Sequence, residues 1–163
     1  MNVFEQVKPS IEAAAAEFGL DPDILFCVAQ IETAYISKYV YGPDTGLSGE
    51  KGLFQFMPGT WSDVQAALGV SDPFSPSDAA RGAAFYLARS IPAMLSGSGA
   101  GIDQPSTLRN LILSYNGGAG NVRRGTVSSG ALAYWKKFQR LFLSRKLKKA
   151  VPWLLFDVFK RVM

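Results

Sequence analysis

The chain has 163 residues, of which 48% are apolar and 18% are charged, and its formal net charge is +4. A chain of this length and apolar content forms one compact domain with a real core, which excludes a disordered or collagen-like protein. Its single cysteine, Cys27, cannot form an internal disulfide. The absence of histidine excludes Ser-His-Asp hydrolases, papain-like proteases and most zinc enzymes, so catalysis must use carboxylates, hydroxyls, amides, lysine or arginine.

The N-terminal third of the chain predicts two helices followed by an irregular segment. Apolar residues between 3 and 18 recur at helical spacing, and Gly19 can end that helix in a left-handed conformation. An Asp-Pro pair at 21–22 supplies an N-cap and a first-turn proline for a second helix that reaches Glu32. Residues 35–54 combine β-favouring side chains with several glycines, which predicts an irregular loop or a short hairpin.

The remainder of the chain predicts further helices. They are expected at 59–68, 76–95 and 107–115 and in a C-terminal tail that is interrupted at Pro152. A short Ser- and Gly-rich connector at 96–101 predicts a mobile loop inside the domain. The fold class expected from these elements is mainly α.

Positive charge is concentrated at the C-terminal end. Residues 1–130 hold 8 Lys or Arg against 12 Asp or Glu, whereas residues 131–163 hold 9 against 1 and interleave them with bulky apolar side chains. This pattern predicts a basic amphipathic helix. Either its apolar side packs on the body of the domain, or it attaches the protein to an anionic membrane or polymer. We expect the segment up to about Lys149 to pack on the body and the stretch from Val151 onward to be available for attachment.

The N-terminus does not have the features of a targeting segment. It carries Glu5, Glu12 and Glu17 where a signal peptide would have a basic cap and an apolar core. No apolar run approaches the roughly 18 residues that a membrane span needs. The sequence therefore predicts neither a signal peptide nor a transmembrane helix in this chain.

Glu32 is the strongest candidate for a catalytic residue. It ends an otherwise apolar run, so its carboxyl emerges where a helix passes from the core into a glycine-rich loop. Partial burial at such a boundary raises the pKa of a carboxyl and favours the protonated form that a general acid needs. The alternative is a glutamate at a helix end that simply faces water.

Two further segments accompany Glu32. Residues 52–60, Gly-Leu-Phe-Gln-Phe-Met-Pro-Gly-Thr, combine a close backbone approach with an amide at Gln55 and the start of a helix. Tyr115 and Asn116 end a helix and are followed by glycines that allow the backbone to turn. Taken singly, the first segment is also consistent with an ordinary loop-to-helix junction and the second with a C-terminal cap.

Together and in this order, these segments resemble the catalytic domain of the soluble lytic transglycosylase family, which is related in fold to goose-type lysozyme. The resemblance covers roughly residues 8–125. The matching blocks are Glu32-Thr33, Gly52-Leu53-Phe54-Gln55, Met57-Pro58-Gly59-Thr60, Asp72-Pro73 with the helix from Ala79 to Leu87, and Tyr115-Asn116-Gly117-Gly118 with Val122. The chain departs from the family pattern in a longer interval between Glu32 and Gln55 and in lacking the family's later Pro-x-Glu-Thr segment.

The resemblance implies a lysozyme-like helical fold with a catalytic domain at 1–130 and a basic extension at 131–163. It also implies cleavage of the β-1,4 bond between N-acetylmuramic acid and N-acetylglucosamine in peptidoglycan glycan strands, with formation of a 1,6-anhydro ring. In that scheme Glu32 acts first as acid and then as base, without a metal or an organic cofactor. The expected partners are the glycan strands and, through 131–163, a membrane or a virion, with no nucleic acid, and the protein is expected to be a monomer.

The same resemblance assigns roles to the residues around Glu32. Tyr115 would orient its carboxyl, and Gln55 and Asn116 would hold acetamido and hydroxyl groups of the glycan. The expected substrate-binding residues are Thr33, Ser48, Phe54, Gln55, Met57, Tyr115 and Asn116, with Phe54 and Met57 keeping the cleft dry and Ser48 or Thr45 serving as the loop hydroxyl.

Two other functions stay open from the sequence. A goose-type lysozyme-like hydrolase would need an additional carboxylate to direct water, for which only Asp44 and Glu50 are available between Glu32 and Gln55. A non-catalytic glycan-binding or structural virion protein could keep the same fold. Because peptidoglycan lies outside the cytoplasmic membrane, we expect a bacteriophage protein associated with the virion, or an enzyme that acts in the bacterial periplasm.

Overall fold

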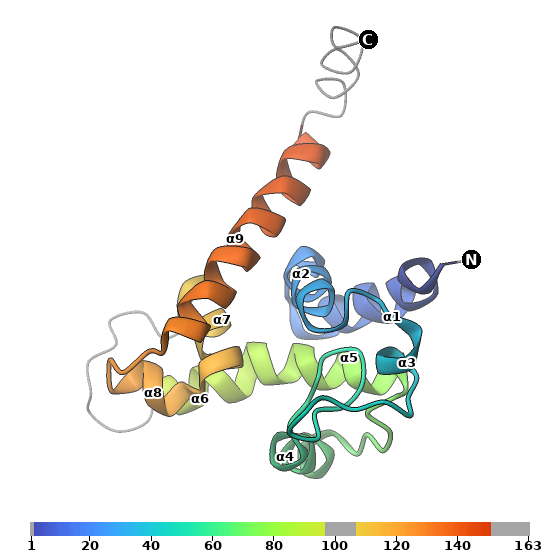
Figure 1. Cartoon of the computed structure of the whole chain (residues 1–163), viewed down its shortest axis with the longest axis horizontal. Helices are drawn as coiled ribbons and strands as arrows, with labels where there is room; N and C mark the ends of the chain where they lie inside the picture. Colours follow the sequence, from blue (N-terminus) through green and yellow to red (C-terminus); the bar gives the residue numbers. More distant parts are fainter. Residues whose placement is uncertain (1, 97–106, 151–163) are drawn as a thin grey trace, which may run out of the picture.

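The structure is a computed structural model that describes residues 2–96 and 107–150, and every regular element within those residues is a helix (Figure 1). The helices are α1 (Val3–Phe18), α2 (Pro22–Thr33), α3 (Ser37–Val40), α4 (Pro58–Leu68), α5 (Pro76–Phe85), the π-helical turn η1 (Tyr86–Ser90), α6 (Ile91–Ser96), α7 (Leu108–Gly117), α8 (Ala119–Arg123) and α9 (Ser129–Ala150). The predicted mainly helical fold is therefore confirmed. In place of a hairpin, the described part of the loop contains the short helix α3 and one isolated antiparallel bridge between Lys51 and Phe56.

Local sequence signals fix the first two helices. The Asn2 side chain accepts a hydrogen bond from the Glu5 backbone N–H at the start of α1, and Gly19 ends the helix at φ 69°. Asp21 then caps α2 through the Asp23 backbone N–H, at 3.0 Å. These two helices place a run of buried side chains from α2, including Leu25 and Val28, in the centre of the core.

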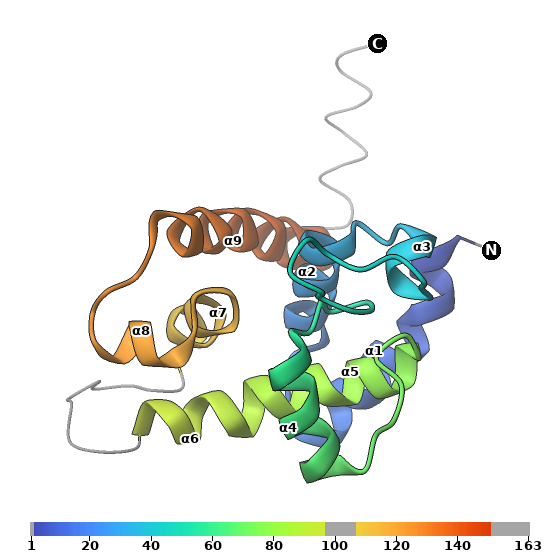
Figure 2. The same ribbon diagram turned by 60° about the horizontal axis from the view of Figure 1, so that its bottom comes forward.

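The helix predicted over 76–95 is one rod formed by α5, η1 and α6 (Figure 2). Its backbone stays in the right-handed helical region at Phe85, Tyr86 and Ile91, so only the hydrogen-bonding pattern changes in the middle. α1 packs along α5, and α4 crosses α5 at Gly82. A Cβ at Gly82 would lie 2.9 Å from a Val64 methyl group, which explains why this approach needs glycine.

α9 belongs to the body of the molecule. In Figure 2 it lies along one edge, the α5–η1–α6 rod lies along the opposite edge, and α7 lies between them. α9 packs on α2 and α7 and buries Ala131, Tyr134 and Phe138 in the core. The segment up to Lys149 thus packs on the body as expected, while the expectations for residues 97–101 and for the stretch from Val151 fall outside the described residues.

Candidate active site

Glu32 lies in the last turn of α2, at the boundary between core and surface. The preceding residues Leu25, Val28 and Ala29 are fully buried, whereas Glu32 itself is half-buried. α2 ends here because Ala34 and Tyr35 adopt left-handed conformations with φ of 47° and 58°. The core thus withdraws one side of the carboxyl from water and leaves the other side accessible.

A tyrosine from α9 holds the Glu32 carboxyl. The Tyr134 hydroxyl donates a hydrogen bond of 2.6 Å to Glu32 Oε1, across 102 positions of sequence. Burial raises the pKa of Glu32 to about 7, and the charge of Glu50 also raises it, while the Tyr134 hydrogen bond and the charge of Lys137 lower it. A carboxyl with this pKa keeps its proton in a substantial fraction of molecules near neutral pH and can give it to a leaving oxygen.

A tight turn at residues 51–56 is closed by backbone hydrogen bonds between Lys51 and Phe56. Gly52 has a φ of 72°, and a Cβ there would meet the Pro73 carbonyl oxygen at 1.7 Å, so only glycine fits. Gln55 has a φ of 47° and donates from its side-chain amide to the Gly52 carbonyl, at 2.9 Å. The turn is thereby held in a single strained conformation, with Phe54 buried beneath it.

Tyr115 fastens this turn to α7 and does not hold Glu32. Tyr115 was expected to orient the Glu32 carboxyl, but its hydroxyl donates to the Phe54 carbonyl at 2.7 Å. Tyr115 still lies near Glu32. Burial and, next to it, the charge of Glu32 raise the pKa of the Tyr115 phenol well above its usual value. The hydroxyl on Glu32 is that of Tyr134, a residue within the predicted basic extension at 131–163.

The other expected substrate-binding residues fall into two groups. Thr33 and Phe54 are buried, so neither side chain is accessible to a ligand. The Thr33 hydroxyl donates to the Ala29 carbonyl at 3.1 Å and helps to end α2. Met57, Asn116 and Ser48 are exposed and accessible to a ligand. Thr45 is also exposed, so both candidates for the loop hydroxyl remain accessible.

The two carboxylates of the loop differ in their relation to Glu32. Asp44 forms an exposed ion pair with Lys38, at 2.8 Å. Glu50 accepts a hydrogen bond of 2.9 Å from the Ser48 backbone N–H, and its charge raises the pKa of Glu32. Glu50 is therefore the loop carboxylate that acts on the Glu32 environment. Across residues 2–96 and 107–150, no three His, Cys, Asp or Glu side chains gather into a potential metal site.

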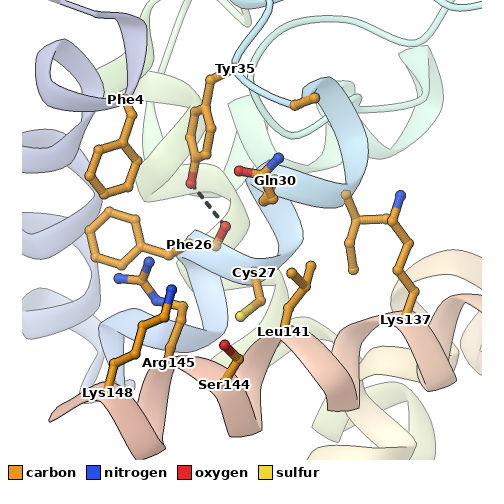
Figure 3. Close-up of a pocket in the computed structure, with 12 residues that line it drawn as sticks. Phe4, Phe26, Cys27, Gln30, Tyr35, Lys137, Leu141, Ser144, Arg145 and Lys148 are labelled. Carbon is orange, nitrogen blue, oxygen red and sulfur yellow. Dashed lines mark hydrogen bonds between the residues drawn. The ribbon is translucent and has the colours of Figure 1, made fainter. Parts of the chain in front are cut away.

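A separate pocket of about 360 Å³ lies between α2 and α9 (Figure 3). It is lined from α2 by Cys27, Gln30 and Ile31, which recur at helical spacing on a face that does not include Glu32. Figure 3 shows the Tyr35 hydroxyl directed at the Phe26 carbonyl, a hydrogen bond of 2.9 Å. The pocket thus lies where α2 packs against α9, and Glu32 does not line it, although its lining residue Lys137 carries the charge that lowers the pKa of Glu32.

Comparison with known families assigns the chain. Residues 9–138 match the model of the transglycosylase SLT domain. The chain belongs to the SLT domain family. Members of this family are peptidoglycan lytic transglycosylases, so the chain is an enzyme that cleaves glycosidic bonds of peptidoglycan. A search of curated proteins finds no match.

The extent of the SLT domain agrees with the packing of α9. The match continues beyond residue 130 and includes Tyr134, whose hydroxyl contacts Glu32. No helix in the described ranges meets the length and apolarity needed to cross a bilayer.

Proposed function

We propose that Glu32 is the single catalytic carboxyl of this SLT domain and that it cleaves the bond between N-acetylmuramic acid and N-acetylglucosamine. The observation that supports this proposal is the half-buried carboxyl with a pKa of about 7, held by Tyr134. In the first step Glu32 gives its proton to the glycosidic oxygen as the bond from C1 to that oxygen breaks. The 2-acetamido group of the substrate stabilises the positive charge that develops at C1.

In the second step the same residue acts as a base. The Glu32 carboxylate takes the proton of the C6 hydroxyl while the C6 oxygen bonds to C1, which closes the 1,6-anhydro ring and returns Glu32 to its protonated form. No water is consumed, so the reaction needs no second carboxylate to direct water. The Tyr134 hydroxyl keeps the carboxyl oriented through both transfers.

Accessible side chains around Glu32 supply the substrate contacts in this proposal. Met57 covers the glycan with its exposed side chain, and Asn116 and Ser48 offer polar groups to acetamido and hydroxyl substituents. Gln55 shares its amide between the turn and the ligand. Because the substrate lies outside the cytoplasmic membrane, the enzyme would work in the periplasm or from a bacteriophage virion.

Removal of the Tyr134 hydroxyl tests the positioning of Glu32. The hydrogen bond lowers the pKa of Glu32, so in Tyr134→Phe that pKa rises and the decline of activity with increasing pH moves to higher pH. We also expect kcat to fall about tenfold because the carboxyl is less well oriented. The measurement is a pH profile of kcat on glycan strands for both proteins.

Tyr115→Phe is the matched control for this variant. It also removes one buried hydroxyl, but the lost hydrogen bond goes to the Phe54 carbonyl in the turn. We expect a lower melting temperature and a pH profile like that of the wild type. An unshifted profile in Tyr134→Phe would show that its hydroxyl does not act on Glu32.

Product analysis separates the transglycosylase from a lysozyme-like hydrolase. Anhydro muropeptides are one water lighter than muropeptides with reducing ends, so mass spectrometry of the released fragments distinguishes them. Glu50 is the carboxylate that a hydrolase would use to direct water, since its charge acts on Glu32. We expect anhydro products from the wild type and from Glu50→Gln. Because the variant lacks one negative charge near Glu32, the pKa of Glu32 falls, and the decline of activity with increasing pH moves to lower pH.

Asp44→Asn is the control, because Asp44 is paired with Lys38 in the exposed part of the loop. It should match the wild type in product and pH profile. Predominantly reducing ends from the wild type, together with an inactive Glu50→Gln, would instead identify a hydrolase that uses two carboxylates.

A further inference from the structure

α9 has an outer face that no other described element covers. Ala131, Tyr134 and Phe138 lie on its buried side. The opposite side carries a stripe at helical spacing that consists of Leu132, Lys136, Gln139, Arg140, Leu143 and Leu147. We call this stripe the outer face of α9; all of its members are exposed.

The outer face combines positive charge with apolar side chains. α9 contains seven Lys or Arg and no Asp or Glu. Arg145, Lys146 and Lys149 are neutralised in part by Asp21 and Asp23 of the α2 region. In the described part of the chain, no ion pair involves Lys136 or Arg140.

Exposed leucines lie next to one another on this face. Leu143 and Leu147 are 59% and 62% exposed and lie one turn apart. Leu143 also borders a shallow groove with Lys136, Gln139 and Arg140. An anionic polymer would be attracted by the cations alone, whereas a lipid bilayer uses both the cations and the leucines.

We propose that the outer face of α9 binds the surface of an anionic lipid bilayer, with the helix lying in the interface plane. The leucines enter the boundary between headgroups and acyl chains, and Lys136 and Arg140 contact anionic headgroups. At 22 residues, α9 offers a contact roughly 33 Å long. This surface lies on α9 itself, before the stretch from Val151.

The binding surface and the catalytic group lie on opposite sides of one helix. Tyr134 is on the buried face of α9, where its hydroxyl reaches Glu32, and Figure 2 shows the other helices on that side of α9. A protein that lies on a bilayer through the outer face of α9 therefore presents the Glu32 side away from the lipid. This orientation directs the site toward the cell wall, and this consequence rests on the proposed function.

Co-sedimentation with vesicles tests the proposal on the full chain. The vesicles contain phosphatidylcholine with or without phosphatidylglycerol, and the variants are Lys136→Glu/Arg140→Glu and Leu143→Ser/Leu147→Ser. We expect the wild type to bind only the vesicles with phosphatidylglycerol, with weaker binding at high salt. Both double variants should bind at least about tenfold more weakly. Lys136→Glu/Arg140→Glu loses two cations that each contribute on the order of 1 kcal/mol near an anionic surface. Leu143→Ser/Leu147→Ser loses the apolar area that would be buried in the interface.

The control, Arg89→Glu/Arg109→Glu, changes the net charge by the same amount at two exposed sites outside α9 and should bind within about threefold of the wild type. Activity on soluble glycan strands should be equal in all four proteins, which keeps this test separate from that of the proposed function. The proposal is overturned if the wild type does not bind anionic vesicles or if the α9 variants bind them as well as the control does. Inorganic polyphosphate serves as a second probe, an anionic polymer without lipid. Binding of polyphosphate alone, with equal strength in the leucine variant, would also overturn the proposal.

Discussion

Glu32→Gln should abolish peptidoglycan cleavage while leaving the fold intact. Loss of a general acid costs a factor of about 10² to 10⁴, and in the proposed mechanism Glu32 serves in both proton transfers, so we expect the upper end of that range. The Gln side chain keeps the size of the Glu side chain and can still accept the Tyr134 hydrogen bond. The measurement is turbidity clearing of purified sacculi together with chromatography of released muropeptides.

Thermal unfolding is the control for this variant. Because folding raises the pKa of Glu32, the ionised carboxylate lowers the stability of the folded protein above pH 7, and Gln removes that charge. The melting temperature of Glu32→Gln should therefore equal or exceed that of the wild type above pH 7. Retention of more than about a tenth of the activity would reject Glu32 as the acid. Binding of both proteins to sacculi without release of muropeptides would instead identify a glycan-binding protein.

Asp23→Asn should produce the largest loss of stability. The Asp23 side chain is 0% exposed, and its oxygens lie 2.8 to 3.0 Å from Arg145 Nε and from the Lys146 and Lys149 ammonium groups of α9. Removing one side of a buried ion cluster costs about 3 to 5 kcal/mol. The three cations are 31% to 58% exposed and can regain water, so we expect about 2 to 4 kcal/mol and a melting temperature lower by roughly 5 to 15 °C.

Glu17→Gln provides the comparison for Asp23→Asn. It breaks a bidentate ion pair with Arg81 whose side chains are 37% and 42% exposed, and its effect should be much smaller. An equal effect of the two substitutions would show that burial of Asp23 does not strengthen its contacts.

The pH dependence of the Asp23 contribution has a definite sign. Burial alone would raise the pKa of Asp23, but the hydrogen bonds from Lys149, Arg145 and Lys146 outweigh it and lower the pKa below the ordinary 3.8. A carboxyl whose pKa is lowered by folding contributes its stability above the unfolded value and loses it as the pH falls through the folded value. The stability difference between wild type and Asp23→Asn should thus be constant near neutral pH and shrink below about pH 4.

Local signals allowed most of the helices to be predicted from the sequence. The cap at Asp21 and the glycine at 19 act within a few residues, and the structure confirms both of them. α3 and α8 were not predicted, since each has only four or five residues and lies in a glycine-containing segment. Helices this short depend on packing, which periodicity does not report.

The candidate site could be predicted only in part. Glu32 could be predicted as the candidate carboxyl because it ends an apolar run, which is a local feature of the sequence. Tyr134 was missed because its contact with Glu32 spans 102 positions and because the charge of the tail suggested an extension. The signal that could have found it is the spacing of Ala131, Tyr134 and Phe138, which places a hydroxyl on the buried face of α9.

The hydrogen bond of Tyr115 shows the same limit. A tyrosine beside Asn116 resembled the family motif, but its partner is a backbone carbonyl 61 positions away, and no pattern of side chains encodes such an acceptor. Gly52 indicated the turn more directly than Tyr115 indicated its partner. Only glycine allows the Pro73 carbonyl to approach the backbone at this position, so the residue type itself reports the close approach.

The contacts of α9 also couple the environment of Glu32 to the docking of this helix. Tyr134 contacts Glu32, and Arg145 and Lys149 contact Asp23 across 122 and 126 positions, so both sets of contacts need α9. A chain in which only α1 to α8 have folded contains Glu32 and Asp23 but lacks the Tyr134 hydroxyl and the cations of α9 that contact them. The environment of Glu32 and the docking of α9 therefore form in the same folding event, so a change that detaches α9 should alter both the stability of the protein and the pKa of Glu32.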